Sequence, residues 1–260
     1  MIGAGLQLDI AWEDPAESLR RAEPLAERAA AAGARLLALP ELFATGFSMR
    51  SREMAEHAGE VTGFLGRLAS HLGVWVLGGY AEPGRSRPRN ACSLYSPEGR
   101  EVTHYQKIHP FSLAGEPGHY EGGETVVTAE VEGVRVTPFI CYDLRFPELF
   151  RATAMATDLF VVIANWPERR GHAWRTLLQA RAIDCQAYVL GVNRVGQAQG
   201  QEHRGDSALV DPMGLVVASA AATPAVLLGE VDAAEVGRLR QRLSFLADRR
   251  PEVYAALASE

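Results

Sequence analysis

Short apolar segments rich in β-branched residues alternate with longer segments of helical periodicity, and this alternation restricts the possible folds more than any other feature. Apolar residues that recur three and four positions apart mark a helix face, whereas short apolar runs bounded by turn residues mark buried strands. Units of this kind, with β-hairpins between them, build layered sheets covered by helices. The sequence therefore predicts an α/β fold.

The expected elements follow from these patterns and from the turn residues between them. Strands are expected over residues 2–10, 35–39, 74–80, 91–95, 101–106, 125–130, 134–140, 159–164, 188–193, 207–211, 215–218 and 226–231. Helices are expected over 14–32, 61–72, 173–185 and 233–243, and another follows Pro147. Asp14-Pro15 supplies an N-cap and a first-turn proline, whereas Pro24 predicts a kink or a restart in the first helix. Since no linker interrupts the series, we expect a single domain over 1–260, with a core over about 1–243 and a C-terminal tail over 244–260.

The bulk composition excludes several classes of function. Hydrophobic residues make up 47% and charged residues 22% of the 260 residues, which suits a globular protein with a full core. The net charge of −6 leaves no basic excess to neutralise phosphates, so no nucleic-acid partner is expected. We find neither a transmembrane-length apolar run nor a signal peptide, and therefore expect no membrane association and a cytoplasmic location. The three widely spaced cysteines suit a reducing compartment.

Cys141 ends the apolar run Val134–Ile140 and opens the segment Cys-Tyr-Asp-Leu-Arg-Phe-Pro-Glu at 141–148. A strand that ends on cysteine and turns at once into a helix lifts the sulfur off the sheet edge. The N–H groups and dipole of that helix then favour thiolate. A buried cysteine that only packs is the alternative, because free cysteine is among the most buried residue types. The local pattern favours neither interpretation over the other.

Glu41 and Lys107 share this placement, since each also follows an apolar strand. Catalytic sites in α/β folds gather outside the carboxyl ends of strands, so a shared edge would bring a carboxylate, an ammonium and a thiol together. Glu41 would then accept the thiol proton, and Lys107 would stabilise the thiolate and a later oxyanion. The thiol of Cys141 would attack an amide or nitrile carbon and form a thioester. Taken singly, each charge would be an ordinary salt bridge or a solvated side chain.

Three motifs carry a resemblance to a known family: Leu-Pro-Glu-Leu-Phe at 39–43, Tyr-Gln-Lys-Ile-His-Pro-Phe at 105–111, and the segment at 141–148. With these motifs in order, the chain resembles the nitrilase superfamily of carbon–nitrogen hydrolases from its first strand to about Tyr254. The resemblance implies a four-layer α-β-β-α sandwich with a Glu-Lys-Cys triad. Glu41 would be the general base, Lys107 the oxyanion stabiliser and proton donor, and Cys141 the nucleophile.

The resemblance also implies two supporting groups. The backbone N–H of Tyr142 would complete the oxyanion hole. Glu116 fits the place of a second family glutamate, which would hydrogen-bond Lys107 and orient the substrate or the hydrolytic water. The alternative for Glu116 is an ordinary loop carboxylate. No metal or other cofactor is implied, and relatives of this kind are homo-oligomers, at least dimers.

Among the subgroups, the motifs look most like those of the omega-amidases, which hydrolyse the terminal amide of 2-oxo dicarboxylic acid monoamides such as 2-oxoglutaramate. Such a substrate carries a carboxylate, and Arg145, four residues after Cys141, is the first candidate to bind it. Pairing with Glu148 is an equally favoured role for Arg145, and Arg194 and Arg204 are weaker candidates. The expected pocket walls are the aromatic side chains near the motifs, although core packing is the alternative for about half of them: Phe43, Phe47, Phe111, Tyr120 and Trp166.

Several other functions remain open. An N-carbamoyl amino acid or a deaminated glutathione amide would suit the same chemistry, and a non-hydrolytic, partner-dependent subunit is a further possibility. A papain-like Cys–His hydrolase would require His109 or His172 beside Cys141. A zinc site has little support, because the chain has neither Cys-x-x-Cys nor His-Glu-x-x-His.

Overall fold

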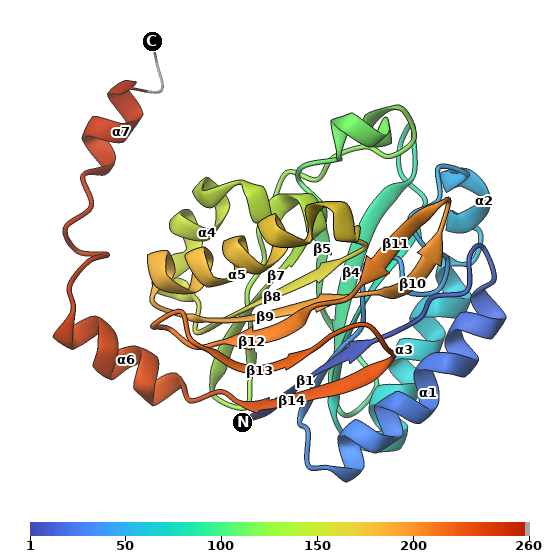
Figure 1. The fold of residues 1–260 in the computed structure, drawn as a ribbon, viewed down its shortest axis with the longest axis horizontal. Coiled ribbons are helices and arrows are strands. Elements are labelled where there is room, and N and C mark those ends of the chain that lie inside the picture. The colour runs from blue at the N-terminus through green and yellow to red at the C-terminus, as the bar shows by residue number, and fades with distance from the viewer. Residues whose placement is uncertain (258–260) are drawn as a thin grey trace.

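The computed structural model describes residues 1–257, and its centre is a pair of six-stranded sheets (Figure 1). The first sheet has the order β14 (Ala225–Glu230), β1 (Ile2–Gln7), β2 (Leu36–Ala38), β3 (Trp75–Glu82), β4 (Arg89–Tyr95) and β5 (Glu101–Gln106). The second has the order β13 (Val216–Ala220), β12 (Ser207–Val210), β9 (Tyr188–Asn193), β8 (Leu159–Ala164), β7 (Val134–Ile140) and β6 (Ala129–Val131).

Both sheets have the same internal plan. The strands β1, β2 and β3 are parallel, as are β7, β8 and β9. Their immediate neighbours β14, β4, β6 and β12 run antiparallel to them, and the edge strands β5 and β13 pair antiparallel with β4 and β12. Parallel strands in layered folds are covered on both faces, so their sequences become nearly continuous apolar runs. This explains why β8, Leu-Phe-Val-Val-Ile-Ala, is buried at every position.

Alternate residues of the segment formed by β2 and by Leu39, which follows it, face opposite sides of the first sheet. Leu36 and Ala38 belong to the core cluster that also contains Val161 and Ile163, on the face of the second sheet that packs against the first. Leu37 and Leu39 belong to the core under the helices. Because side chains alternate along a strand, one short segment contributes to both cores.

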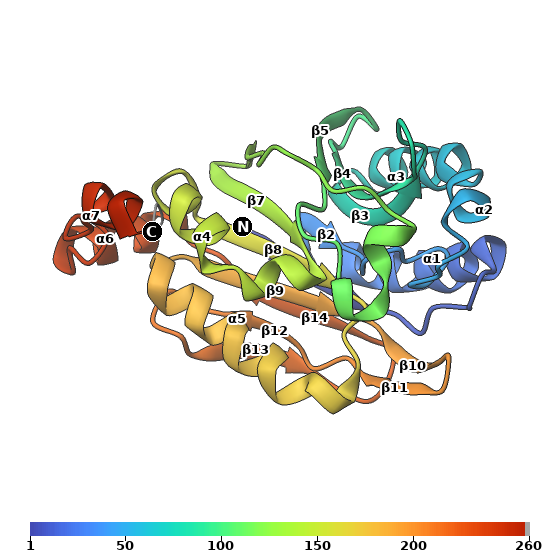
Figure 2. The same cartoon turned by 90° about the horizontal axis from the view of Figure 1, so that it is seen from above.

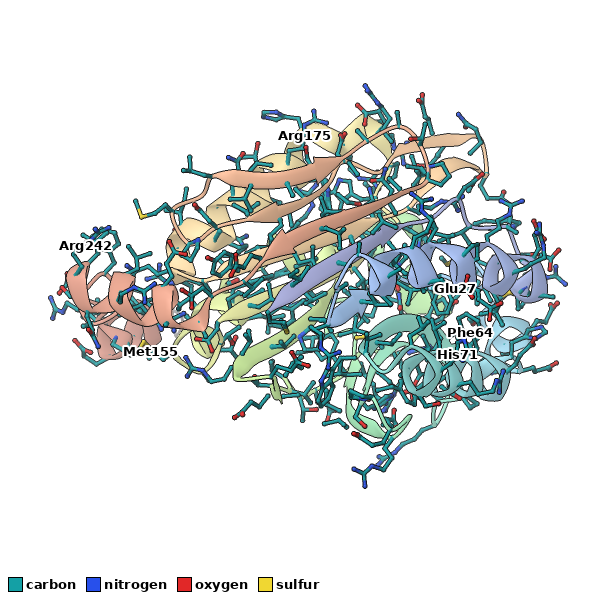
Figure 3. The ribbon with its side chains drawn as sticks, turned by 90° about the horizontal axis from the view of Figure 1, so that it is seen from below. Glu27, Phe64, His71, Met155, Arg175 and Arg242 are labelled. Carbon is teal, nitrogen blue, oxygen red and sulfur yellow. The ribbon has the colours of Figure 1, made fainter. Side chains whose placement is uncertain are left out.

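Helices cover the outer faces of the sandwich (Figure 2). On the first sheet these are α1 (Pro15–Ala31) and α3 (Ala58–Leu72), and on the second α4 (Pro147–Thr153) and α5 (Gly171–Cys185). Figure 3 shows Glu27 of α1 close to Phe64 and His71 of α3, where these two helices lie side by side. The four-layer α-β-β-α sandwich expected from the sequence is confirmed.

The first helix begins as predicted but continues through its internal proline. The carboxylate of Asp14 accepts a hydrogen bond of 3.0 Å from the backbone N–H of Glu17, and Pro15 occupies the first turn. No restart occurs at Pro24, because α1 runs unbroken to Ala31. Its buried face includes Leu19, Ala22 and Ala26, so packing on the sheet offsets the hydrogen bond that proline removes.

Some elements differ from the predictions. The strand expected over 125–130 is confined to β6, because the preceding stretch is held by isolated bonds such as the one between the Thr128 and Thr137 hydroxyls. The hairpin of β10 (Val195–Ala198) and β11 (Gln201–Arg204) and the helix α2 (Ser51–Ala55) were not predicted. The helix α6 (Ala233–Arg242) was predicted, and α7 (Pro251–Leu257) lies in the expected tail. Both extend away from the sandwich in Figure 1.

The segment after Cys141 also departs from the prediction of an immediate helix. It forms a short 3₁₀ turn over Cys141–Arg145, and α4 begins only at Pro147. Phe146 between them is extended, with φ −104° and ψ 92°. Proline disfavours helical backbone in the residue before it, which separates the turn from the helix. No helix within residues 1–257 is long and apolar enough to cross a membrane.

Candidate active site

The polar residues predicted from strand ends meet where the two sheets face each other. Glu41 follows β2 and Lys107 follows β5, both in the first sheet. Cys141 follows β7 in the second sheet, and Asn165, which was not predicted, follows β8 beside it. The first residue of a 3₁₀ turn over Glu116–Gly118 also lies here, because its carboxylate reaches Lys107.

Lys107 lies between two buried carboxylates. Its Nζ is 2.9 Å from Glu41 Oε1, 3.1 Å from Glu116 Oε1 and 2.9 Å from Glu116 Oε2. The Lys107 side chain is 1% exposed, and both carboxylates are 0% exposed. Buried charges persist only when they are paired and hydrogen-bonded, so these three groups form one electrostatic unit.

Asn90, at the start of β4, connects the two carboxylates and was not predicted from the sequence. Its side-chain Nδ2 donates to Glu41 Oε1 at 2.7 Å and to Glu116 Oε1 at 3.1 Å. The other oxygen of Glu41 accepts from the backbone N–H of Asn165 at 2.8 Å, and the backbone N–H of Phe111 donates to Glu116. Each carboxylate is therefore fixed from several directions, and Glu41 is held by groups from both sheets.

A close approach of backbones sets the position of Glu41. The residue after it, Leu42, has a positive φ of 45°, and Phe43 N–H donates to the carbonyl of Gly79 at 3.0 Å. A Cβ atom placed on Gly79 would lie 2.9 Å from the Cα of Glu41 and 3.0 Å from the backbone N of Leu42. Only glycine lets β3 approach the Glu41 turn this closely.

The environment of the cluster changes its proton affinities. Burial lowers the pKa of Lys107, but the charges of Glu116 and Glu41 outweigh it and raise that pKa well above its usual value. Burial also raises the pKa of Glu116, as does the nearby charge of Glu41, while Lys107 lowers it. The ammonium therefore keeps its proton at neutral pH.

The thiol of Cys141 is protonated in this arrangement. Burial raises its pKa well above the usual value, the Glu41 and Glu116 charges add to this effect, and Lys107 opposes it. A hydrogen bond with Glu41 also raises the thiol pKa, because it favours the neutral form. The net effect of burial and of the two carboxylates is thus opposite to the thiolate that the turn was expected to favour.

The backbone at Cys141 is strained and held by a buried acid. Cys141 has a positive φ of 48°, a conformation that costs on the order of 1–3 kcal/mol for a residue with a side chain. Asp143 Oδ2 accepts from the backbone N–H of Ile140 at 3.1 Å and from the Tyr105 hydroxyl at 2.8 Å. Arg181 of α5 donates twice to the carbonyl of Leu144, at 3.1 and 2.9 Å. These bonds maintain the turn that presents the sulfur.

Tyr142 is the second residue of this turn, where the backbone N–H has no partner within the turn itself. Its ring contacts Phe111 at a centroid distance of 4.8 Å and Phe146 at 5.1 Å. A neutral thiol beside a carboxylate, an ammonium and the first N–H groups of a 3₁₀ turn has the components of an activated nucleophile with an oxyanion site.

A pocket opens beside Cys141 and Asn165. Phe47 and Phe111 line it, as predicted, and the structure adds residues that the sequence analysis missed: Trp12, Ala114, Pro167, Arg169, Arg170, Ala198, Gln199, Gln201 and His203. Lys107 Nζ lies 5.3 Å from the centre of the Phe47 ring, so this ring adjoins both the cluster and the pocket. No local sequence pattern marks the added residues, since they come from loops and from the unpredicted hairpin.

The other residues predicted to line the pocket or to bind the substrate carboxylate do not line this pocket. The Arg145 guanidinium lies 4.9 Å from the Trp166 ring, and neither side chain lines the pocket. Phe43 lies in the core under the helices, and the buried Tyr120 hydroxyl donates to the carbonyl of Ser48 at 2.9 Å.

Arg170 is a cation that lines the pocket. Its guanidinium lies 5.0 Å from the Phe111 ring. Of the weaker candidates, Arg194 is fully buried and donates to the carbonyl of Ile10 at 3.1 Å, while Arg204 is exposed on β11.

The two histidines of the Cys–His alternative lie elsewhere. His109 Nδ1 is 2.9 Å from Asp143 Oδ1, and its ring stacks on Phe146 at a centroid distance of 3.6 Å. His172 is exposed on α5. Across residues 1–257, no group of three or more His, Cys, Asp and Glu side chains has a metal-binding arrangement.

The chain matches the family model for carbon-nitrogen hydrolases over residues 4–241. Omega-amidase YafV of Escherichia coli (strain K12) is 35% identical over 239 residues, covering 91% of this chain and 92% of that protein. The 2-oxoglutaramate amidase of Bacillus subtilis (strain 168) is 32% identical over 253 residues, covering 96% of this chain and 97% of that protein.

Solved structures agree over nearly the whole chain. A CN-hydrolase superfamily protein from Xanthomonas campestris, with an arsenic adduct in its active site, has a TM-score of 0.90 at 30% identity and covers 96% of this chain and 97% of its own. A mutant amidase from Nesterenkonia sp. AN1, with the acetamide moiety of fluoroacetamide added covalently at its active-site cysteine, has a TM-score of 0.88 at 25% identity. That match covers 98% of this chain and 96% of the amidase chain. This chain belongs to the carbon–nitrogen hydrolase family and is an amidohydrolase.

Proposed function

We propose that this amidohydrolase hydrolyses the terminal amide of a 2-oxo dicarboxylic acid monoamide such as 2-oxoglutaramate and releases ammonia. The observation that carries the chemistry is the buried Glu41–Lys107–Glu116 cluster directly beside Cys141, at the pocket. The similarity to an omega-amidase and to a 2-oxoglutaramate amidase supports the substrate class.

In the first half of the reaction, the Cys141 sulfur attacks the amide carbon while Glu41 accepts the thiol proton. The resulting oxyanion is stabilised by the Lys107 ammonium and by the backbone N–H of Tyr142. The C–N bond then breaks, the proton held by Glu41 passes to the leaving nitrogen, and ammonia departs. A thioester on Cys141 remains.

In the second half, water attacks the thioester carbon and Glu41 accepts a proton from it. The C–S bond breaks, Cys141 regains its proton, and the dicarboxylic acid product leaves. Glu116 holds Lys107 through both of its oxygens, at 3.1 and 2.9 Å, and is therefore proposed as a positioning residue and as a second contact for the water. Both steps use groups that are already fixed in place, which is the condition for electrostatic stabilisation of a transition state.

The substrate carboxylate would bind at the cationic side of the pocket. Arg170 is half-buried there and Arg169 is exposed beside it, both lining the cavity. Arg145 is near enough to influence the pKa of Arg170, and so adds positive potential without lining the pocket. Arg170 thus replaces Arg145 as the first candidate for binding the carboxylate, while Phe47 and Phe111 would enclose the carbon chain.

The test is ammonia release from 2-oxoglutaramate, with glutamine, a deaminated glutathione amide and an N-carbamoyl amino acid assayed in parallel. We expect preferential turnover of 2-oxoglutaramate and a loss of at least about 10⁴-fold in Cys141→Ala, because the covalent route disappears. Cys92→Ala, which changes a buried cysteine of the first sheet, is the matched control and should remain active. Turnover of another substrate alone would reject the 2-oxo acid amide, and full activity of Cys141→Ala would reject the nucleophile.

A further inference from the structure

The β10–β11 hairpin contributes one side of the pocket. Ala198 and Gln201 are cross-strand partners, as are Gly196 and His203, and the two-residue turn between the strands uses positive φ at Gln199 and Gly200. Gln201 and His203 are two residues apart and so face the same side, whereas Glu202 between them is exposed. Ala198, Gln201 and His203 all line the pocket.

The hairpin is anchored at its base, so its side chains have defined positions. Val195 N–H donates to the carbonyl of Leu8 at 3.0 Å, and Asp9 forms a parallel bridge with Val195. The buried Arg194 donates to the carbonyls of Val195 and Ile10 at 3.0 and 3.1 Å. A rigid support of this kind is what precise ligand recognition requires.

Two polar atoms on the pocket face of the hairpin have no hydrogen-bond partner among the described residues. They are Gln201 Oε1 and His203 Nδ1, both buried from solvent. The His203 side chain is only 7% exposed. Buried polar groups in folded proteins almost always have a partner, and leaving one unpaired is costly. Unpaired atoms that line a cavity therefore indicate a ligand with complementary polar groups.

The chemistry of this ligand follows from the charge state of the hairpin. Burial, followed by the charges of Arg194 and Arg170, lowers the pKa of His203 to about 4, so the ring is neutral at physiological pH. With its proton on Nδ1, the neutral imidazole presents an N–H at the unpaired position. Turning the Gln201 amide places Nε2, a donor, where the unpaired Oε1 lies. The hairpin therefore offers uncharged donors, which suit a carbonyl oxygen rather than a second anion.

The position of Arg170 completes the arrangement. The 3₁₀ turn Glu168–Arg170 packs against β11, and the Arg170 charge lowers the pKa of His203. In a 2-oxo acid the carbonyl carbon is bonded directly to the carboxylate carbon. Groups that bind the oxo oxygen must consequently lie beside the cation that binds the carboxylate, as Gln201 and His203 do.

We propose that Gln201 and His203 form the subsite for the 2-oxo group of the substrate and determine specificity for it. This inference rests on the proposed function, in which Cys141 attacks the amide at the opposite end of the same molecule. The hairpin pair then discriminates between a 2-oxo acid amide and the otherwise identical amide that lacks the oxo group. Such discrimination is expected where a site's buried polar atoms are left unpaired by the wrong substrate.

The experiment compares kcat/KM for 2-oxoglutaramate and for glutaramate, which has the same length and carboxylate but no 2-oxo group. His203→Phe and Gln201→Met keep much of the side-chain volume and remove the polar atoms. We expect each to lower kcat/KM for 2-oxoglutaramate by about 10- to 100-fold and to change that for glutaramate by less than about twofold. Glu202→Ala, on the outer face of the same hairpin, is the matched control and should leave both values unchanged.

The possible outcomes separate this inference from the function on which it rests. An equal loss for both substrates would mean that the hairpin is only structural, and no loss for either would mean that the unpaired atoms bind only water. Either result overturns the subsite while the wild-type enzyme still hydrolyses 2-oxoglutaramate. If the wild-type enzyme releases no ammonia from 2-oxoglutaramate, the proposed function fails first and the subsite fails with it.

Discussion

The two large sheets share one strand plan but supply different parts of the chemistry. The first sheet contributes the charges, with Glu41 after β2 and Lys107 after β5, and Asn90 of β4 connecting the carboxylates. The second contributes the uncharged groups, with Cys141 after β7 and Asn165 after β8. The charged groups hold one another within the first half, whereas the sulfur depends on a strained turn in the second. The two halves can therefore be disrupted separately, with different consequences.

The largest effect is expected from removing the central charge of the first half. Lys107→Met leaves two buried carboxylates without their cation, which should destabilise the fold by about 3–5 kcal/mol and abolish turnover. The double variant Lys107→Met/Glu116→Gln removes a carboxylate as well, so it should recover much of the stability and none of the activity. Thermal unfolding and ammonia release measure the two effects, and a fully stable single variant would contradict the idea of one electrostatic unit.

Asn90 tests how the charges of the first half are kept apart. Asn90→Asp replaces a donor to both carboxylates with a third carboxylate, at contact distances of 2.7 and 3.1 Å. We expect a fall in kcat of about 10²-fold, because the displaced Glu41 no longer receives the thiol proton correctly. Asn90→Ser, which removes the donor without adding charge, should lose less. Equal losses in the two variants would show that charge repulsion is not the cause.

Asp143 tests the second half in the same way. Asp143→Asn keeps the shape of the side chain but removes acceptor capacity for Ile140 N–H, Tyr105 and His109. We expect about 1–3 kcal/mol lower stability and a fall in kcat of about tenfold, because the turn that presents the sulfur relaxes. His71→Ala, on the exposed surface of α3, serves as a neutral surface control. Unchanged kinetics in Asp143→Asn would show that the turn keeps its shape without this acid.

The smallest effect is expected on the pKa of the Cys141 thiol. Here the carboxylates of the first half act on the sulfur of the second. Since burial and the two carboxylates raise the thiol pKa, alkylation of Cys141 by iodoacetamide should keep accelerating above pH 9.0, the usual thiol value. Glu116→Gln removes one negative charge, which favours the thiolate and should move the profile to lower pH. Peptide mass spectrometry identifies the alkylated residue. A half-maximal rate below neutral pH would instead show that a positive charge beside the sulfur outweighs burial and the two carboxylates.

Strand patterns predicted the parts of the site that lie directly after strands, because an apolar run followed by a polar residue is visible locally. The helix expected after Pro147 is α4, and the effect of this proline on Phe146, which separates the 3₁₀ turn from the helix, is also local. Asn90 and Asn165 could not be found in this way. An asparagine next to a strand is ordinary in sequence, and only the packing of one sheet on the other brings these two to Glu41.

The pocket was the least predictable part of the molecule. Arg170 comes from a 3₁₀ turn, and Gln201 and His203 come from a hairpin whose Val-Gly-Gln-Ala strand has no clear apolar alternation. These residues converge on Cys141 through contacts between segments far apart in the chain. The sequence therefore indicated the reaction more clearly than the substrate. The residues that would contact the substrate lie on loops and on a hairpin, and such segments have weaker sequence patterns than strands and helices.

The close packing of Gly79 against the Glu41 turn has a consequence for mutational surveys. A methyl group at this position would meet the Glu41 backbone at 2.9 Å, so even alanine would displace the carboxylate from its partners. A complete survey scored by activity alone would therefore rank Gly79 with the nucleophile itself. A parallel survey scored by protein abundance would distinguish the two kinds of position. It would separate residues that take part in the reaction from small residues, such as Gly79, that are needed to position a reacting side chain.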